Sequence, residues 1–208
     1  MKTEQEKFWE GEFGDEYSSR NQGPQLLASN RALFADVLKR TRGVTSVLEL
    51  GANVGNNLRA LRDLLPDATL AGVELNATAA RALTEWGQAE VFNQSLLDFR
   101  ADRRWDFVLV KGTLIHLAPE RLPDAYDVVE RCAGRYVCLV EYYNPAPVEV
   151  SYRGHSGKLF KRDFARELMQ RHPQLELVDY GFVYRGDANF PQDDVTWFVM
   201  ERKPGTSP

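Results

Sequence analysis

The fold of this chain is decided by the stretch Glu49-Leu50-Gly51-Ala52-Asn53-Val54-Gly55-Asn56-Asn57, which joins an apolar run to a segment of helical period. The run from Thr45 to Leu50 predicts a strand, and the leucines from Leu58 to Leu65 predict a helix that Pro66 ends. Glycines at such a junction permit a tight turn and let a ligand approach the amides at the helix N-terminus. We therefore predict a ligand-binding turn between a strand and a helix.

The pattern of a strand followed by a helix continues on both sides of this turn. We predict further strands at residues 70–75, 89–92, 105–110 and 136–142, and helices at 24–40, 77–86, 119–132 and 162–171. Such alternation is typical of a parallel sheet with helices on both faces. The β-rich runs 175–184 and 195–202 follow with no helix between them, which predicts an antiparallel pair. We therefore expect an α/β fold with an antiparallel strand near its C-terminus.

The composition limits the classes of function. Of the 208 residues 43% are apolar and 27% are charged, as expected of one soluble domain. A formal net charge of −4 disfavours nucleic-acid binding, and no stretch is apolar enough to span a membrane. The polar N-terminus lacks a signal-peptide core, and Cys132 and Cys138 lie in segments predicted to be buried. We expect a cytoplasmic protein with reduced thiols and no metal site; the oligomeric state is left open.

An aromatic segment precedes the first predicted helix. We interpret residues 1–23 as an N-terminal arm, 24–202 as the main domain and 203–208 as a tail. The aromatic side chains of the arm are those of Phe8, Trp9, Phe13 and Tyr17. They either pack on the sheet or form a lid over a ligand, for which Gly11 and Gly14 would supply hinges.

The residues around the turn discriminate between nucleoside ligands. Glu74 ends the next predicted strand, where a carboxylate accepts hydrogen bonds from ribose hydroxyls. A dinucleotide site requires three glycines, but here their positions hold Gly51, Asn53 and Asn56. Glu49 would repel a pyrophosphate, whereas it suits a ligand that carries an ammonium group. A ligand such as S-adenosylmethionine therefore fits this turn better than NAD.

These residues resemble the class I S-adenosylmethionine-dependent methyltransferases. The stretch 47–55 is similar to their first motif, Glu74 to their ribose-binding acid, and Asn93-Gln94-Ser95-Leu96-Leu97-Asp98 to their adenine-contacting segment. The resemblance covers about Val44 to Arg202. It implies a Rossmann-like, doubly wound sheet of seven strands, mostly parallel with one antiparallel strand near the C-terminus.

A narrower resemblance is to the pseudaminic acid biosynthesis-associated methylases. The segments that carry it are Phe8-Trp9-x-Gly11-x-Phe13-Gly14-x-x-Tyr17-x-x-Arg20-Asn21, Lys111-Gly112-Thr113-Leu114-Ile115-His116-Leu117, Tyr152-Arg153-Gly154-His155, Lys158-Leu159-Phe160-Lys161-Arg162-Asp163-Phe164-Ala165 and Thr196-Trp197-Phe198. This family is named largely by its place in sugar-biosynthesis gene clusters, so the resemblance implies a sugar acceptor only indirectly.

The superfamily resemblance implies a role for each matched position. The residues that would line the methionine end of the cofactor are Glu49, Gly51, Asn53 and Gly55. Those that would contact its adenosine are Glu74 at the ribose and Leu75, Ser95 and Leu96 at the purine. Lys111 and Gly112 would face its sulfonium. If the N-terminal arm forms a lid, Tyr17 or Arg20 would reach the carboxylate of the cofactor.

Ligands of an open α/β sheet bind outside the carboxyl ends of the strands. The polar groups just past the predicted strands 105–110 and 136–142 are His116, Glu141, Tyr142, Tyr143 and Asn144. Among them His116 is a candidate general base or an ordinary helix-start histidine, and Tyr142 is a wall of the acceptor site or the end of a core strand. His155, with Arg153 and Lys158, indicates an anionic acceptor or a solvated basic loop.

We therefore expect an enzyme that uses S-adenosylmethionine to methylate an oxygen or nitrogen of a small polar metabolite, with a sugar or sugar-derived intermediate as the leading acceptor. The alternatives are a methyltransferase of a natural-product or carboxylic acid intermediate, an NAD-dependent oxidoreductase, which the missing glycines disfavour, and a non-catalytic nucleoside-binding protein.

Overall fold

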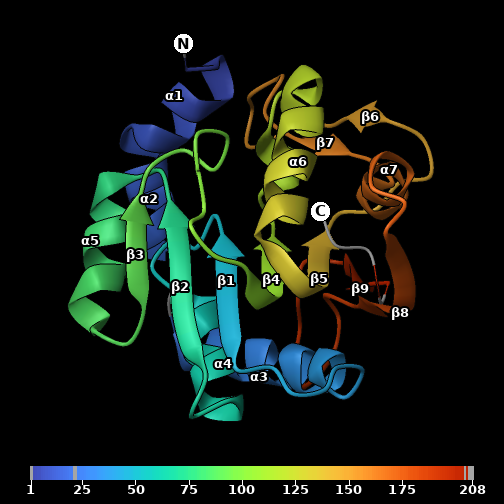
Figure 1. Cartoon of the computed structure of the whole chain (residues 1–208). Coiled ribbons are helices and arrows are strands. Elements are labelled where there is room, and N and C mark those ends of the chain that lie inside the picture. Colours follow the sequence, from blue (N-terminus) through green and yellow to red (C-terminus); the bar gives the residue numbers. More distant parts are fainter. Residues whose placement is uncertain (1, 21–22, 204, 206–208) are drawn as a thin grey trace.

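A computed structural model of the chain describes residues 2–20, 23–203 and 205, apart from the side chains of residues 19 and 20. Its centre is a sheet of seven strands in the order β3-β2-β1-β4-β5-β9-β8 (Figure 1). These strands are β1 (Ser46–Leu50), β2 (Thr69–Glu74), β3 (Glu90–Asn93), β4 (Trp105–Lys111), β5 (Ala133–Glu141), β8 (Leu175–Val183) and β9 (Val195–Arg202). The helices are α1 (Glu4–Glu10), α2 (Glu12–Arg20), α3 (Pro24–Leu38), α4 (Asn56–Leu64), α5 (Ala77–Trp86), α6 (Leu122–Cys132) and α7 (Phe164–Arg171), with the 3-10 turns η1 (Leu114–His116) and η2 (Pro119–Arg121).

The strand directions confirm the predicted fold class. β1, β2, β3, β4 and β5 pair in parallel, whereas β9 runs antiparallel to both β5 and β8. The strand order reverses at β1 and β4, which are neighbours in the sheet although β2 and β3 lie between them in sequence. In doubly wound sheets this reversal opens a crevice beyond the carboxyl ends of the strands, and ligands bind there.

Helices cover both faces of the sheet, so the central strands are buried on both sides. Successive residues of β1 alternate between two cores, as the two-residue period of a strand requires. Val47 packs in the core that includes Phe34 of α3 and Leu61 of α4. Leu48 packs in the core that includes Val129 of α6. This explains why the strands read as continuous apolar runs.

Both cysteines are fully buried and unpaired, as their apolar surroundings in the sequence predict. Cys132 ends α6 and Cys138 lies in the middle of β5. Burial raises the pKa of the Cys132 thiol to about 11 and raises that of Cys138 further. In the part of the chain that the structure describes, no helix is both long and apolar enough to cross a membrane.

The N-terminal arm differs from the prediction, because two helices, α1 and α2, precede the helix that begins at Pro24. Thr3 starts α1 with a capping box: its hydroxyl accepts the amide of Glu6, and the Glu6 carboxylate accepts the amide of Thr3. The pattern Thr-x-x-Glu is a known start signal for a helix and was available in the sequence.

The expected hinge at Gly14 is wrong. Gly14 lies inside α2, and a Cβ at this position would overlap the carbonyl of Trp9 and the side-chain amide of Asn76. Its missing side chain therefore lets α2 pack closely against the end of α1. Gly11, by contrast, ends α1 and separates the two helices.

No strand is predicted between the strand at 136–142 and the helix at 162–171, yet this segment forms a small sheet of its own. β6 (Val148–Glu149) pairs with β7 (Phe160–Lys161) in a second, two-stranded antiparallel sheet. A tight turn at Tyr152 and His155 lies between these strands, with reciprocal backbone hydrogen bonds of 2.9 Å. The turn brings Tyr152 and Arg153 to the cavity described next.

Candidate active site

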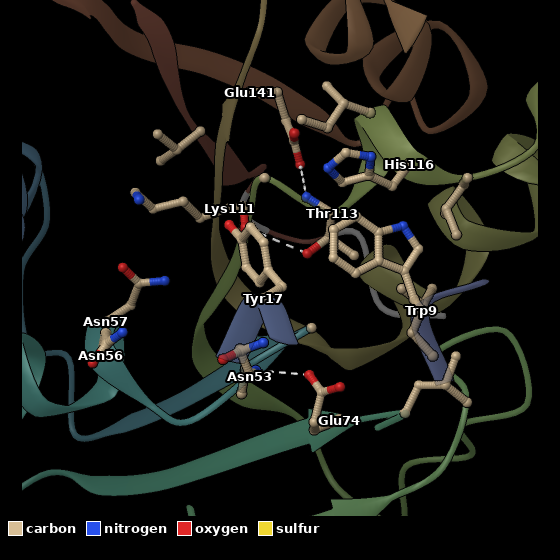
Figure 2. A pocket seen from close by; sticks show the side chains of 18 of the residues that line it. Trp9, Tyr17, Asn53, Asn56, Asn57, Glu74, Lys111, Thr113, His116 and Glu141 are labelled. Carbon is tan, nitrogen blue, oxygen red and sulfur yellow. Dashed lines mark hydrogen bonds between the residues drawn. The ribbon is translucent and has the colours of Figure 1, made fainter. Parts of the chain in front are cut away.

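A cavity of about 440 Å³ lies beyond the carboxyl ends of β1, β2, β4 and β5. Of the candidate residues that the sequence singled out, those lining it are Trp9, Tyr17, Gly51, Asn53, Glu74, Leu75, Ser95, Leu96, Lys111, Gly112, His116, Glu141, Tyr142 and Arg153. Figure 2 shows that Glu74 lies at one end of the view and Glu141 and His116 at the other. The candidates that do not line it include Glu49, Gly55, Tyr143, Asn144, His155 and Lys158, and the side chain of Arg20 lies outside the described residues.

The turn after β1 has the conformation that its residues predict. Gly51 has φ +85°, and a Cβ there would overlap the Thr113 side chain, so this position requires glycine. Asn53 has φ +48°, in the left-handed region that asparagine tolerates better than most residues. The amides of Gly51 and Ala52 donate to the carbonyl of Val73 at 2.9 and 3.0 Å, which fixes the turn to the end of β2.

Glu74 links this turn to β2 from inside the cavity. One carboxylate oxygen accepts the amide of Asn53 and the other accepts the amide of Asn76, each at 2.7 Å. Burial raises the pKa of Glu74, although these amides oppose the shift. The side chain still lines the cavity, so its remaining lone pairs face any ligand bound there.

Glu49 lies one layer behind the cavity wall, which corrects the expectation that it lines the site. Its Oε1 accepts the side-chain amide of Asn57, a residue that does line the cavity. Within the described chain, the other oxygen of Glu49 and the amide oxygen of Asn57 are both buried and have no hydrogen-bond partner. Burial raises the pKa of Glu49 to about 8, against the influence of Asn57 and nearby Lys111.

Gly55 serves the packing of two helices. It caps α4 with φ +83°, and a Cβ at this position would overlap the side chain of Leu83 in α5. Contact between α4 and α5 thus accounts for this glycine without a ligand. Its place in the sequence motif does not distinguish a role in helix packing from a role in ligand binding.

Lys111 ends β4 and acts electrostatically on the buried carboxyl groups of both Glu49 and Glu141, lowering their pKa. Desolvation lowers its pKa, while Glu49, Asp193 and Glu141 act to raise it. The structure gives its Nζ neither a hydrogen bond nor an ion pair with any described residue. Its side chain therefore lines the site with its hydrogen-bond donors free to contact an anionic group of a ligand.

His116 is held as a neutral imidazole. Its Nδ1 lies 2.6 Å from the carbonyl oxygen of Lys158, and because a carbonyl only accepts, Nδ1 carries the proton. Burial lowers the pKa of His116 to about 4, although the bond to Lys158 opposes the shift. Its Nε2 is therefore a hydrogen-bond acceptor at neutral pH, and a weak base.

Glu141 organises the segment that carries His116. Its Oε1 accepts the amide of Thr113 at 2.9 Å (Figure 2) and that of Leu114 at 2.9 Å. Its Oε2 is buried and has no hydrogen-bond partner among residues 2–20, 23–203 and 205. Burial raises the pKa of Glu141 to about 7, against the amides and Lys111, which lower it.

Aromatic rings form a wall around this end of the cavity. We call Trp9, Tyr17, Tyr142 and Tyr152 the aromatic wall; all four line the cavity. The rings of Trp9 and Tyr17 meet edge to face at 5.2 Å, and His116 lies 4.4 Å from Trp9 and 5.0 Å from Tyr152. Burial raises the pKa of Tyr17 to about 12, so its hydroxyl remains protonated.

The basic loop has a structural role rather than the expected place in the site. His155 is exposed and packs against the ring of Phe8 at 5.2 Å, outside the cavity lining. Lys158 pairs with Glu4 at 3.7 Å and lies 5.2 Å over the same ring. Both side chains thus hold α1 in place, and Arg153 is the member of this group that lines the cavity.

Several residues of the site were missed. Glu6 of α1 lines the cavity and accepts a hydrogen bond from Ser95, which attaches the arm to the segment after β3. Ser18 of α2 contacts the side-chain amide of Asn53 at 3.0 Å. The capping box places Glu6 on a helix, but no sequence pattern indicates contacts over such separations.

Comparison with known proteins identifies the fold. A scan against protein-family models and a search of the curated proteins gave no match. Among solved structures, DesVI from Streptomyces venezuelae is 16% identical, with a TM-score of 0.65 over 92% of this chain and 98% of DesVI. The sugar N-methyltransferase KedS8 from Streptoalloteichus is 17% identical, with a TM-score of 0.66 over 93% of each chain.

Magnesium protoporphyrin IX methyltransferase from Synechocystis, solved with bound S-adenosylmethionine, is 12% identical, with a TM-score of 0.69 over 97% of this chain and 99% of that one. These likenesses cover nearly the whole of each chain, but their sequence identities are low. They show that the chain has the Rossmann-like fold of the S-adenosylmethionine-dependent methyltransferases.

Proposed function

We propose that this protein is an S-adenosylmethionine-dependent methyltransferase that acts on an oxygen or nitrogen of a small polar metabolite. The observation that carries the proposal is the buried carboxylate of Glu74, which ends β2 and faces a cavity at the reversal of the strand order. A carboxylate at this position suits the two hydroxyls of a ribose. The solved S-adenosylmethionine complex of similar fold supports the choice of cofactor.

The polar groups left without partners fit the amino acid end of this cofactor. Within the described residues, the side-chain oxygen of Asn57, which lines the cavity, lacks a hydrogen-bond donor, and an ammonium group supplies such a donor. Lys111 offers a donor to a carboxylate in the same wall. A pyrophosphate would instead lie against Glu74, with the carboxyl group of Glu49 just behind the wall, so NAD fits these residues less well.

The remaining roles follow from the positions of the side chains. Leu75, Ser95 and Leu96 line the cavity beside Glu74 and would flank the purine, and Gly112 leaves space beside Lys111. When bound, the cofactor supplies an activated methyl group, so the protein has to position the acceptor and exclude water. We assign the acceptor to the end formed by His116 and the aromatic wall, where His116 accepts a hydrogen bond from it.

The arm completes the site in this proposal. Trp9 and Tyr17 come from α1 and α2, and the contacts of Glu6 with Ser95 and of Ser18 with Asn53 attach these helices to both ends of the cofactor region. Residues 1–23 therefore act as a lid over a domain that spans residues 24–202. A sugar or sugar-derived acceptor is supported by the resemblance to the pseudaminic acid-associated methylases and by the likeness to a sugar N-methyltransferase.

Calorimetric titration of the purified protein with S-adenosylmethionine, S-adenosylhomocysteine and NAD tests the proposal. We expect saturable binding of the first two and none of NAD. Binding of NAD without binding of either sulfur compound would overturn the proposal. Tight binding of S-adenosylhomocysteine without turnover across a broad acceptor panel would favour a non-catalytic nucleoside-binding protein.

A further inference from the structure

We propose that the methyl acceptor is an amine, which binds with its nitrogen at Glu141 against the aromatic wall. The inference rests on the proposed function and specifies its substrate class. It goes beyond the choice between oxygen and nitrogen, which neither the fold nor the cofactor site decides. Three properties of this end of the cavity carry it: charge, ring faces and the strength of the available bases.

The charges that line the cavity favour a cationic group. The acidic side chains of the lining are Glu6, Glu74, Glu141 and Asp193, and the basic ones are Lys111 and Arg153. Burial raises the pKa of Glu141 to about 7, against the influence of Lys111. The lining thus holds more acidic than basic side chains, and a bound ammonium group would favour their ionised forms, whereas a carboxylate or a phosphate would oppose ionisation.

Among the buried acids of the lining, Glu141 is the one with an oxygen that has no hydrogen-bond donor in the described part of the chain. Ser95 and Thr3 donate to Glu6, and the amides of Asn53 and Asn76 donate to the two oxygens of Glu74. Glu141 is only 3% exposed, and its Oε2 lacks a hydrogen-bond donor within the described chain. A buried carboxylate oxygen of this kind gains a charge-assisted hydrogen bond from an amine without competition from water.

Aromatic rings line the same end of the cavity. Tyr142 follows Glu141 directly in sequence, and the ring of Trp9 lies 4.4 Å from the imidazole of His116, whose backbone segment Glu141 holds. Aromatic faces attract cations through their quadrupole, most strongly where water is excluded. The neutral imidazole adds an acceptor for a second N–H of the amine. This end of the cavity thus combines a carboxyl group with aromatic rings.

The bases present suit an amine better than an alcohol. Burial keeps His116 neutral and weakly basic, so it is poorly suited to removing the proton of a hydroxyl group. An amine needs only to lose the proton of its ammonium form, for which a carboxylate of raised pKa is a fitting acceptor. Once Glu141 has taken the ammonium proton, the nitrogen lone pair forms the bond to the methyl carbon and the carbon–sulfur bond breaks with its electron pair left on sulfur. The methylated product is then an ammonium ion, and it needs no second proton acceptor.

A matched pair of probes tests the inference. Cyclohexylamine, which is cationic at pH 7.5, and cyclohexanol share a ring and differ in the group that would meet Glu141. We would titrate both by calorimetry or ligand-observed NMR, with and without S-adenosylhomocysteine. The expected result is binding of the amine about tenfold or more tighter than the alcohol in the wild-type protein.

Variants locate the effect. In Glu141→Gln, which keeps an oxygen for the amides of Thr113 and Leu114, the preference for the amine should fall to within about threefold of parity. Asp193→Asn removes a carboxylate from the exposed rim and should weaken the amine less. The affinity of Glu141→Gln for S-adenosylhomocysteine shows that the variant is folded.

The outcomes separate the two proposals. Equal or tighter binding of the alcohol by the wild-type protein, binding of neither probe, or an undiminished preference in Glu141→Gln would each overturn the amine acceptor. If S-adenosylhomocysteine binds in these same experiments, the methyltransferase proposal stands even though the amine acceptor has been refuted. If S-adenosylhomocysteine does not bind, the proposed function itself fails, while the wild-type preference between the probes still decides whether this end of the cavity selects amines.

Discussion

Replacing Glu74 by alanine should weaken both the binding of the cofactor and the fold around it. The carboxylate accepts the amides of Asn53 and Asn76, each at 2.7 Å. The amide of Asn76 is buried and loses its partner, whereas that of Asn53 can turn toward water in the cavity. One orphaned donor costs about 1–3 kcal/mol, and removing a buried charge recovers part of this. We expect a loss of about 2 kcal/mol in the free energy of unfolding.

The effect on affinity should be larger. Two hydrogen bonds from ribose hydroxyls to a carboxylate are worth about 3 kcal/mol together, or roughly a hundredfold in dissociation constant. Calorimetry with S-adenosylhomocysteine measures this loss, and urea unfolding measures the stability. Glu85→Ala, on the exposed face of α5, is the matched control and should change stability by less than about 0.5 kcal/mol.

The two measurements separate the two roles of Glu74. A loss of stability with unchanged affinity for S-adenosylhomocysteine would show that the carboxylate holds the turn and contacts no ribose. Unchanged stability would refute the importance of the two backbone bonds. Glu74→Gln should resemble the alanine variant in affinity, because its amide group would point a donor at one of the two backbone donors.

Three further predictions concern pH, catalysis and packing. Burial raises the pKa of Glu49 to about 8 and that of Glu141 to about 7, so the folded state retains protons that the unfolded state has released. The free energy of unfolding should therefore fall from pH 6.5 to 8. In a series of denaturation experiments, Glu49→Gln should show a flatter dependence of this free energy on pH. A rise over this window would show that these carboxylates are ionised in the native state. His116→Ala should lower turnover more than the affinity for S-adenosylhomocysteine, and wild-type turnover across pH would assign this histidine a structural role only. Gly14→Ala should cost about 1–3 kcal/mol of stability, because its Cβ would overlap the carbonyl of Trp9; wild-type thermal unfolding would contradict this packing.

The sheet was predictable because its strands obey simple rules. Strands buried on both faces read as apolar runs, and Gly87 and Pro66 mark helix ends with little ambiguity. The turn around Gly51 was predictable for a related reason, since positive φ angles restrict the residues that fit. Local sequence thus determines most of the scaffold and the turn after β1 that forms one side of the site.

The other candidate site residues depend on contacts that no local pattern encodes. Glu49 has the right residue type, yet Asn57 stands between it and the cavity. The basic residues His155 and Lys158 suggested an anion site, but the aromatic ring of Phe8 and the carboxylate of Glu4 occupy them. Such outcomes depend on where a distant helix packs, and this information is tertiary.

The two fully buried thiols, in α6 and in β5, provide a built-in probe of how often the core opens. The thiolate is the form that attacks a thiol reagent, so Cys132 and Cys138 react only when the core opens. When opening is rapid and reversible, the rate of thiol modification is proportional to the fraction of molecules that are open. A compound that binds only the closed form slows the modification by a factor of one plus the compound's concentration divided by its dissociation constant. Unlabelled nucleosides and amines could therefore be ranked by how long they delay the colour of a thiol reagent, before any methylated product has been identified.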